Sequence, residues 1–191
     1  MKKKLLLLLL TCFACFLLSN AQEPKPNTPI TDTGSFKLHK LRKQFWDSLP
    51  KPIGWTNDLE NIFSSEEESI LDSIITAFEK ETDIEISIVT LDSTLTSAEL
   101  FNDLALHIAR TWGIGKKDKD NGILICISTG HRRIRISNGY GIEKILSDEE
   151  TNTLLNRYFL PKFKKAQFYT GTYNGLIALI DKLRPKSGSI H

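Results

Sequence analysis

Apolar residues recur at intervals of three and four positions in four segments of the chain, which predicts four amphipathic helices. Three of these segments begin at a Ser or Thr that is followed three residues later by Glu, the capping-box pattern of helix starts. The capping pairs are Ser64 with Glu67 or Ser65 with Glu68, Thr96 with Glu99, and Ser147 with Glu150. The expected helix ends are Gly113, Pro161 and, for the fourth helix around 173–180, a point before Pro185.

Three further segments have the patterns of strands. Residues 84–91 and 132–137 alternate apolar with polar side chains, and 122–128 is an unbroken apolar run, typical of a strand covered on both faces. The short turn at Gly130 makes the last two strands an antiparallel hairpin. The order of these elements predicts an α/β fold, a three-layer α/β/α sandwich with a small mixed central sheet that contains the hairpin.

The first 21 residues have the pattern of a secretory signal peptide. Lys2, Lys3 and Lys4 precede an apolar run over 5–18, and Ser19-Asn20-Ala21 offers short residues for cleavage after Ala21. We therefore expect an exported protein, periplasmic or extracellular. Two alternatives stay open, namely lipid attachment at Cys12 or Cys15 and a retained N-terminal anchor.

The remaining chain divides by composition into three parts. Residues 22–54 form a Pro-containing linker with a short helix expected over 36–49, residues 55–185 form the folded domain, and residues 186–191 form a polar tail. The tail region has no apolar stretch long enough for a C-terminal membrane span. The formal net charge of +2 falls to −1 without Lys2–Lys4, so no nucleic-acid partner is expected.

Several kinds of active site have no support in the sequence. The pair Gly113 and Gly115 lacks the third glycine of a dinucleotide fingerprint, and the four histidines lack the spacing of metal ligands. Cys126 lies within the apolar run 122–128, so we expect a small buried residue rather than a reactive thiol.

Polar residues of interest gather in two loops, 113–122 and 138–148. The first loop leads into the strand 122–128 and the second leaves the strand 132–137, so antiparallel pairing brings both loops to one end of the sheet. The acidic and amide side chains that could converge there are Asp118, Asp120, Asn121, Glu143 and Asp148. Such oxygen donors suit Ca²⁺ or another divalent cation. The same residue types are also normal in solvated turns, which is the alternative interpretation.

Six short segments, taken in order and spacing, resemble the TPM family, which is named for thylakoid-lumen, photosystem-repair and modulator proteins. The resemblance covers roughly residues 55–183. The segments are Asn57-Asp58-Leu59, Trp112-Gly113-Ile114-Gly115, Asp120-Asn121-Gly122-Ile123-Leu124, His131-Arg132-Arg133-Ile134-Arg135-Ile136, Gly139-Tyr140-Gly141-Ile142-Glu143 and Pro161-Lys162-Phe163.

The resemblance implies an α/β/α sandwich that works outside the cytoplasm. Some relatives bind calcium, a plant thylakoid member is described as an acid phosphatase, and others are accessory proteins of membrane complexes. By motif, a metal or phosphate site here would use Asp58, Asp120, Asn121 and Glu143, with Asp118 on the same loop. Arg133 would contact a phosphate or other anion, although a charged face of an edge strand is the commoner explanation for such a residue.

Two functions follow from this resemblance and from the loops. The first is a non-catalytic module that binds calcium and assists an envelope protein or membrane complex. The second is a metal-assisted phosphatase, in which a cation activates water and screens phosphate charge. We expect the first, because the sequence offers no evident pair of nucleophile and base.

Overall fold

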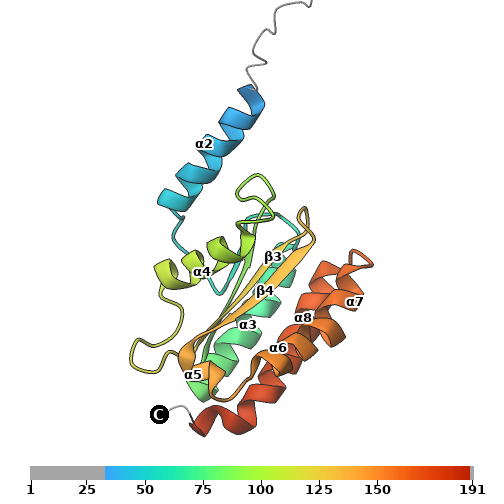
Figure 1. The fold of residues 1–191 in the computed structure, drawn as a ribbon. Helices are drawn as coiled ribbons and strands as arrows, with labels where there is room; N and C mark the ends of the chain where they lie inside the picture. The colour runs from blue at the N-terminus through green and yellow to red at the C-terminus, as the bar shows by residue number, and fades with distance from the viewer. Residues whose placement is uncertain (1–32, 190–191) are drawn as a thin grey trace, which may run out of the picture. The chain divides into compact units, whose positions relative to one another are not determined.

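The computed structural model describes residues 33–189, and residues 34–189 belong to one compact unit (Figure 1). The predicted signal peptide, its cleavage position at Ala21, the lipid-attachment candidates Cys12 and Cys15, and the first part of the linker, residues 22–32, lie outside the described residues. None of the helices in residues 33–189 combines the length and the apolar character needed to cross a membrane.

A four-stranded mixed sheet lies at the centre of the domain. Its strands are β1 (Thr56–Asp58), β2 (Glu85–Thr90), β3 (Gly122–Ser128) and β4 (Arg133–Asn138), in the spatial order β1-β2-β3-β4. The first three are parallel, and β4 pairs antiparallel with β3 as the predicted hairpin. The short strand β1 was not predicted, because its three polar residues carry no apolar period.

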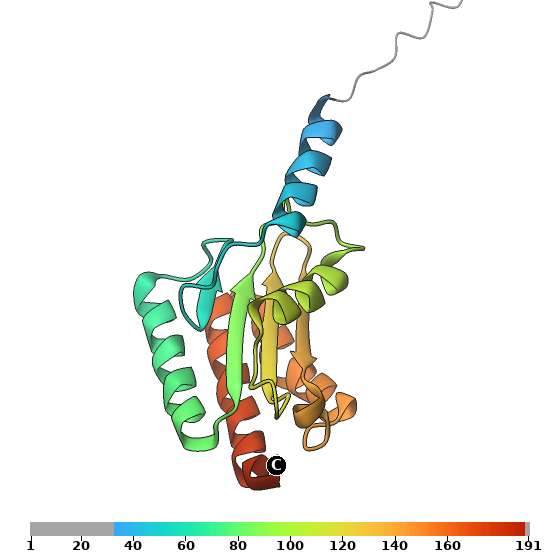
Figure 2. The same cartoon turned by 90° about the vertical axis from the view of Figure 1, so that its left-hand side faces the viewer.

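Helices cover both faces of the sheet, which confirms the predicted α/β/α sandwich (Figure 2). One face is covered by α3 (Ser65–Thr82), α6 (Asp148–Leu154) and α8 (Phe168–Leu183), and the other by α4 (Phe101–Trp112). Successive strand residues point to opposite faces. Ile123 and Ile125 therefore join the cluster under α3 and α8, while Leu124 and Cys126 join the cluster under α4.

Helix starts follow the predicted capping boxes in two cases of three. Ser64 and Ser147 both accept a hydrogen bond from the main chain three residues later, and the Glu side chain there bonds back. The prediction for Thr96 is wrong, since α4 begins at Phe101. Thr96 is instead buried before the helix, and Ser97 Oγ accepts from the Leu100 N–H (3.3 Å).

Pro161 does not end its helix, contrary to expectation. The chain continues from α6 through a π-helical turn, η1 (Leu155–Phe159), into α7 (Leu160–Phe163). Pro161 lies in the first turn of α7. A main-chain N–H at this position would have no acceptor within the helix, so the proline costs no hydrogen bond. The wider turn of η1 accommodates a proline ring that would clash in a regular helix.

The other predicted ends agree with the structure. Gly113 ends α4 in the left-handed conformation (φ 64°), and α8 stops at Leu183, before Pro185. The remaining elements are α2 (Thr33–Asp47), which overlaps the helix expected over 36–49, the single turn α5 (Tyr140–Glu143), and η2 (Arg184–Ser189).

Candidate site at the loop junction

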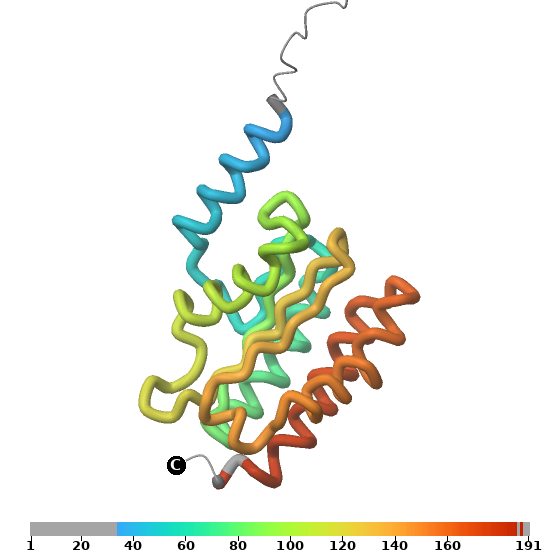
Figure 3. The backbone as a smooth tube through the Cα atoms, viewed as in Figure 1, coloured from blue at the N-terminus to red at the C-terminus, as the bar shows by residue number. Residues whose placement is uncertain are grey.

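The loops 113–122 and 138–148 lie side by side at one end of the sheet, as predicted (Figure 3). The Gly139 N–H donates to the Gly122 carbonyl oxygen (2.8 Å), and the Gly141 N–H donates to the Asp120 carbonyl oxygen (3.0 Å). These main-chain bonds extend the β3–β4 pairing beyond the strands. The two loops therefore form one junction.

Glycine is required where the two loops touch. A Cβ atom on Gly139 would lie 2.2 Å from the Asp120 carbonyl oxygen, and one on Gly141 would lie 2.0 Å from the Lys119 carbonyl oxygen. Both distances are far shorter than any real contact, so a larger residue would push the loops apart. The close main-chain packing fixes where the neighbouring side chains start.

Three carboxylates from the junction line one groove. Asp120, Glu143 and Asp148 surround a hollow of about 600 Å³ between α4, β4 and α5. All three are exposed, and none of their carboxylates takes part in a hydrogen bond or ion pair with any described residue. Asp120 also has a left-handed backbone (φ 48°), which is uncommon outside glycine. The fourth acidic residue, Asp118, is exposed on the same loop.

Basic side chains share this groove with the acidic ones. Arg110 of α4, Lys117 of the first loop and Arg135 of β4 line the same hollow. Arg135 is held in place because its Nε donates to Ser137 Oγ (2.9 Å). The groove therefore presents both signs of charge to solvent.

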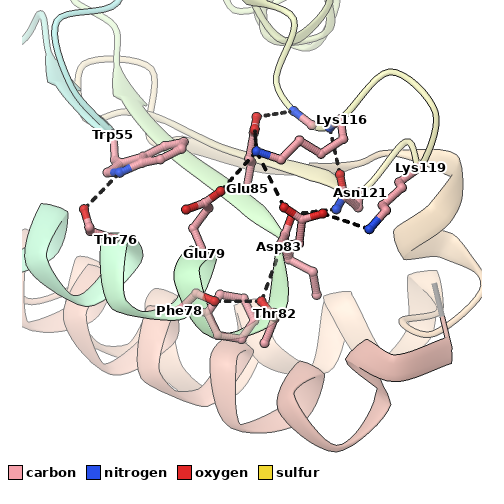
Figure 4. A network of polar contacts seen from close by, with 12 residues as sticks. Trp55, Thr76, Phe78, Glu79, Thr82, Asp83, Glu85, Lys116, Lys119 and Asn121 are labelled. Carbon is pink, nitrogen blue, oxygen red and sulfur yellow. Dashed lines mark hydrogen bonds and ion pairs between the residues drawn. The ribbon is translucent and has the colours of Figure 1, made fainter. Parts of the chain in front are cut away.

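Two lysines tie the first loop to the end of α3 and the start of β2 (Figure 4). Lys116 Nζ lies 3.1 Å from Glu79 Oε1, 3.0 Å from Glu85 Oε1 and 3.7 Å from Asp83 Oδ1. Lys119 Nζ lies 2.8 Å from Asp83 Oδ2. Hydrogen bonds to Glu85 and Glu79 raise the pKa of Lys116 above its usual range. Sequence reasoning missed this network, because its partners are more than 30 residues apart.

The side chain of Asn121 does not line the groove with Asp120 and Glu143, contrary to expectation. Its side chain is buried, Oδ1 accepts from the Lys116 N–H (2.8 Å), and Nδ2 donates to the Asp83 carbonyl oxygen (2.6 Å). Both ends of the amide are thus engaged within the loop. Asn121 shapes the junction and does not reach the groove with Asp120.

Asp58 and Arg133 lie at the opposite end of the sheet from Asp120 and Glu143. Since β1 runs parallel to β3, the end of β1 at Asp58 is far from the start of β3. Asp58 accepts hydrogen bonds from Thr90 Oγ1 and from the Phe63 N–H (2.8 Å). The structure therefore does not bring Asp58 into one site with the loop carboxylates.

Another carboxylate at that opposite end, Glu60, was not predicted from the sequence. It accepts hydrogen bonds from the Thr129 N–H (2.9 Å), from Thr129 Oγ1 (2.7 Å) and from the Gly130 N–H (3.0 Å). These bonds hold the turn between β3 and β4. Arg133, which follows this turn, is exposed and lines a separate hollow of about 610 Å³ with Phe163.

Cys126 is a small buried residue, as predicted. It lies in the middle of β3 within the cluster under α4. Burial raises the pKa of its thiol. A thiol in this environment is not available as a nucleophile.

The groove offers oxygen donors but no preformed metal centre. Carboxylates and main-chain carbonyls are the donors that Ca²⁺ prefers. In residues 33–189, however, no three Asp, Glu, His or Cys side chains are close enough together to hold a metal. The donor chemistry fits a calcium ion, and the arrangement fits only a weak site completed by water.

Several solved structures are similar to this chain. The N-terminal domain of a protein from P. gingivalis, solved by NMR, is similar at 27% identity, with 72% of this chain and 86% of that one covered and a TM-score of 0.64. The BA42 protein from Bizionia argentinensis is similar at 25% identity, with 66% and 85% covered and a TM-score of 0.58.

A third solved structure, an N-terminal domain from Corynebacterium glutamicum, shares the fold at 14% identity, with 76% and 85% covered and a TM-score of 0.50. A search of curated proteins finds no match. The model of the TPM domain matches residues 56–182, which is more than half of the chain. The chain therefore belongs to the TPM domain family.

Proposed function

We propose that this protein is a non-catalytic accessory module that binds Ca²⁺ at the loop junction and assists an envelope protein or membrane complex. The observation that carries the proposal is the set of three carboxylates, Asp120, Glu143 and Asp148, around one groove. No hydrogen bond or ion pair in the described residues uses their carboxylates, whereas the glycine contacts between the loops fix the main chain at Asp120 and in the turn that carries Glu143. Free carboxylates on a rigid junction are suited to an external cation.

The arrangement predicts a weak site. Two or three separated carboxylates with carbonyl and water ligands resemble the calcium sites of extracellular modules, with a Kd of about 10⁻⁴–10⁻³ M. Lys116 and Lys119 already neutralise the acidic groups on the other side of the first loop. The fold should therefore be stable without the ion, and calcium should change the junction only.

A metal-assisted phosphatase is the second candidate. Such an enzyme needs the metal and the anion-binding side chain at the same place. Arg133 lies at the opposite end of the sheet from Asp120, which disfavours the pairing suggested by motif. Arg110 and Arg135 do line the groove and could hold a phosphate there, so the activity is worth assaying.

A calcium titration followed by NMR tests the proposal. Every buried residue of the two hydrophobic clusters lies between Phe63 and Leu183, so residues 22–191 keep the complete core and should fold alone. We expect amide shifts confined to 113–122 and 138–148. The double variant Asp120→Asn/Glu143→Gln should lose them. Shifts elsewhere, or shifts unchanged in that variant, would refute the site.

A matched control removes the same charge at exposed positions outside the groove. Asp103→Asn/Glu149→Gln makes the same chemical changes, and neither residue lines the hollow around Asp120. This control should titrate like the unmodified chain. Hydrolysis of p-nitrophenyl phosphate that is lost with Asp120→Asn/Glu143→Gln and kept in the control would show catalysis and overturn the non-catalytic proposal.

A further inference from the structure

Positive charge is concentrated in the segment that precedes the TPM domain. Residues 33–53 contain five lysines and arginines and one acidic residue, Asp47, a net charge of +4. Residues 54–191 contain sixteen lysines and arginines and twenty acidic residues, a net charge of −4. The small net charge of the whole chain hides this separation. Because of this separation of charge, a negatively charged surface attracts α2 and repels the domain.

Exposed apolar side chains are concentrated in the same segment. Seven large hydrophobic residues are exposed in the described part of the chain, and four of them are Phe36, Leu41, Trp46 and Ile53. Phe36 is 70% exposed and Ile53 is 91% exposed. Apolar and basic residues side by side are typical of helices that lie in a membrane interface.

One face of α2 is used to hold the helix on the domain. The Arg42 guanidinium donates to the carbonyl oxygens of residues 93–94 (3.1 and 3.3 Å). The Trp46 ring stacks on His107 with 4.5 Å between ring centroids, and Phe45 packs against the cluster under α4. This side of α2 has its partners within the chain.

The other face of α2 has no such partners within the described residues. Phe36, Lys40 and Lys43 follow each other at intervals of four and three residues, so they lie along one side of the helix. Lys43 pairs with Asp47 (2.6 Å), and both side chains remain more than half exposed. Lys37 is also exposed.

We propose that this outer face of α2 lies on the surface of a bilayer containing anionic phospholipid. Lysines attract the lipid headgroups, Phe36 enters the interface, and the net negative domain is repelled from the same surface. That repulsion orients the protein with α2 toward the lipid.

A membrane-attached N-terminus, which is one of the alternatives to cleavage after Ala21, would also favour a lipid surface over an acidic protein. The apolar run 5–18 ends fourteen residues before Thr33, a length that spans at most roughly 50 Å. An N-terminus retained in the membrane would hold α2 within that distance of the bilayer, and lipidation at Cys12 or Cys15 would hold it within roughly 60–75 Å.

Vesicle sedimentation with residues 22–191 tests the proposal without the apolar run. We expect stronger partition onto phosphatidylcholine vesicles that contain phosphatidylglycerol than onto phosphatidylcholine alone, weakening as salt is added. Replacing Lys37, Lys40 and Lys43 with Gln should weaken the partition by about 100-fold, at roughly fivefold per lysine. Circular dichroism melts check that the variant is folded.

The control removes three lysines elsewhere. Lys162, Lys164 and Lys165 lie on or just after α7, and their replacement with Gln changes the net charge by the same amount. This control should bind like the unmodified chain. An equal loss in the control, equal binding to both kinds of vesicle, or binding to soluble polyanions such as polyglutamate without vesicle binding would overturn the proposal. Phe36→Ser, which keeps every charge, should also weaken binding.

Discussion

Gly141 leaves less room for an added Cβ atom than Gly139, the other glycine of the second loop, so Gly141→Ala tests how closely the two loops pack. The added Cβ would lie 2.0 Å from the Lys119 carbonyl oxygen and 3.1 Å from the Asp120 carbonyl oxygen. Real contacts do not fall below 3.0 Å, so the loops must separate by about 1 Å. Main-chain atoms form both sides of this contact and cannot rotate away.

The expected cost can be worked out from three contributions. Overpacking at such a contact costs about 1–3 kcal/mol. Loss of the bond from the Gly141 N–H to the Asp120 carbonyl oxygen costs about 1 kcal/mol more. Alanine restricts the unfolded chain and returns about 0.4–1 kcal/mol. Together these give a net loss of about 1–3.6 kcal/mol in the free energy of unfolding.

Denaturant unfolding measures this loss as a lower midpoint with an unchanged slope. Gly188→Ala is the control, because no described atom lies within 4 Å of its added Cβ, and its stability should change by less than about 0.5 kcal/mol. Gly141→Ala should also weaken the calcium response, since it moves Asp120 away from Glu143. If both variants unfold at the same denaturant concentration, the loops do not pack as described.

Two further predictions concern stability elsewhere in the domain. A hydrogen bond from Lys182, with help from the Ser147 N–H, lowers the pKa of Glu150 from 4.5 to about 2. Because the folded-state pKa is the lower one, the stabilisation is present above pH 4.5 and is lost as the pH falls toward 2. The melting temperature of the unmodified chain should thus exceed that of Glu150→Gln above pH 4.5 and match it near pH 2. Gly175→Ala would place a Cβ 2.1 Å from Cε2 of the Phe159 ring. In thermal unfolding it should cost about 1–3 kcal/mol of stability, and the smaller side chain of Phe159→Leu should restore part of this loss. An unchanged melting temperature in Gly175→Ala would show that η1 and α8 do not pack this closely.

The sequence predicted the elements whose pattern is local. The Ser64 capping box and the apolar stripe of α3 need only neighbouring residues, and the alternation in β4 needs only its own six residues. The strand β1 escaped prediction because its residues are polar and its burial comes from β2 beside it. The prediction that Pro161 ends its helix was wrong because a π-helical turn precedes it and accommodates the proline ring. No local sequence pattern indicated that turn.

The candidate site could likewise be predicted only where it depends on local pairing. Antiparallel pairing of β3 with β4 is a local hairpin, and it was enough to bring the Asp120 loop to the Glu143 loop. The place of Asp58 depends on β1 being parallel to β3 through β2, which involves paired residues 32 and 37 positions apart. The ties from Lys116 to Glu79 and from Glu60 to Thr129 span similar or longer separations.

Glu60 at one end of the sheet differs from Asp120 and Glu143 at the other in whether the fold uses the acidic side chain. Glu60 accepts from the main-chain N–H groups of the β3–β4 turn, so its neutralisation would weaken bonds that the turn needs. Asp120 and Glu143 accept from no described group, so their neutralisation should leave the stability nearly unchanged. A loss of cation response in the Asp120 and Glu143 variants therefore reports on binding alone. The same loss after a change at Asp58 would be ambiguous, because Asp58 also holds Thr90 and the start of α3 in place.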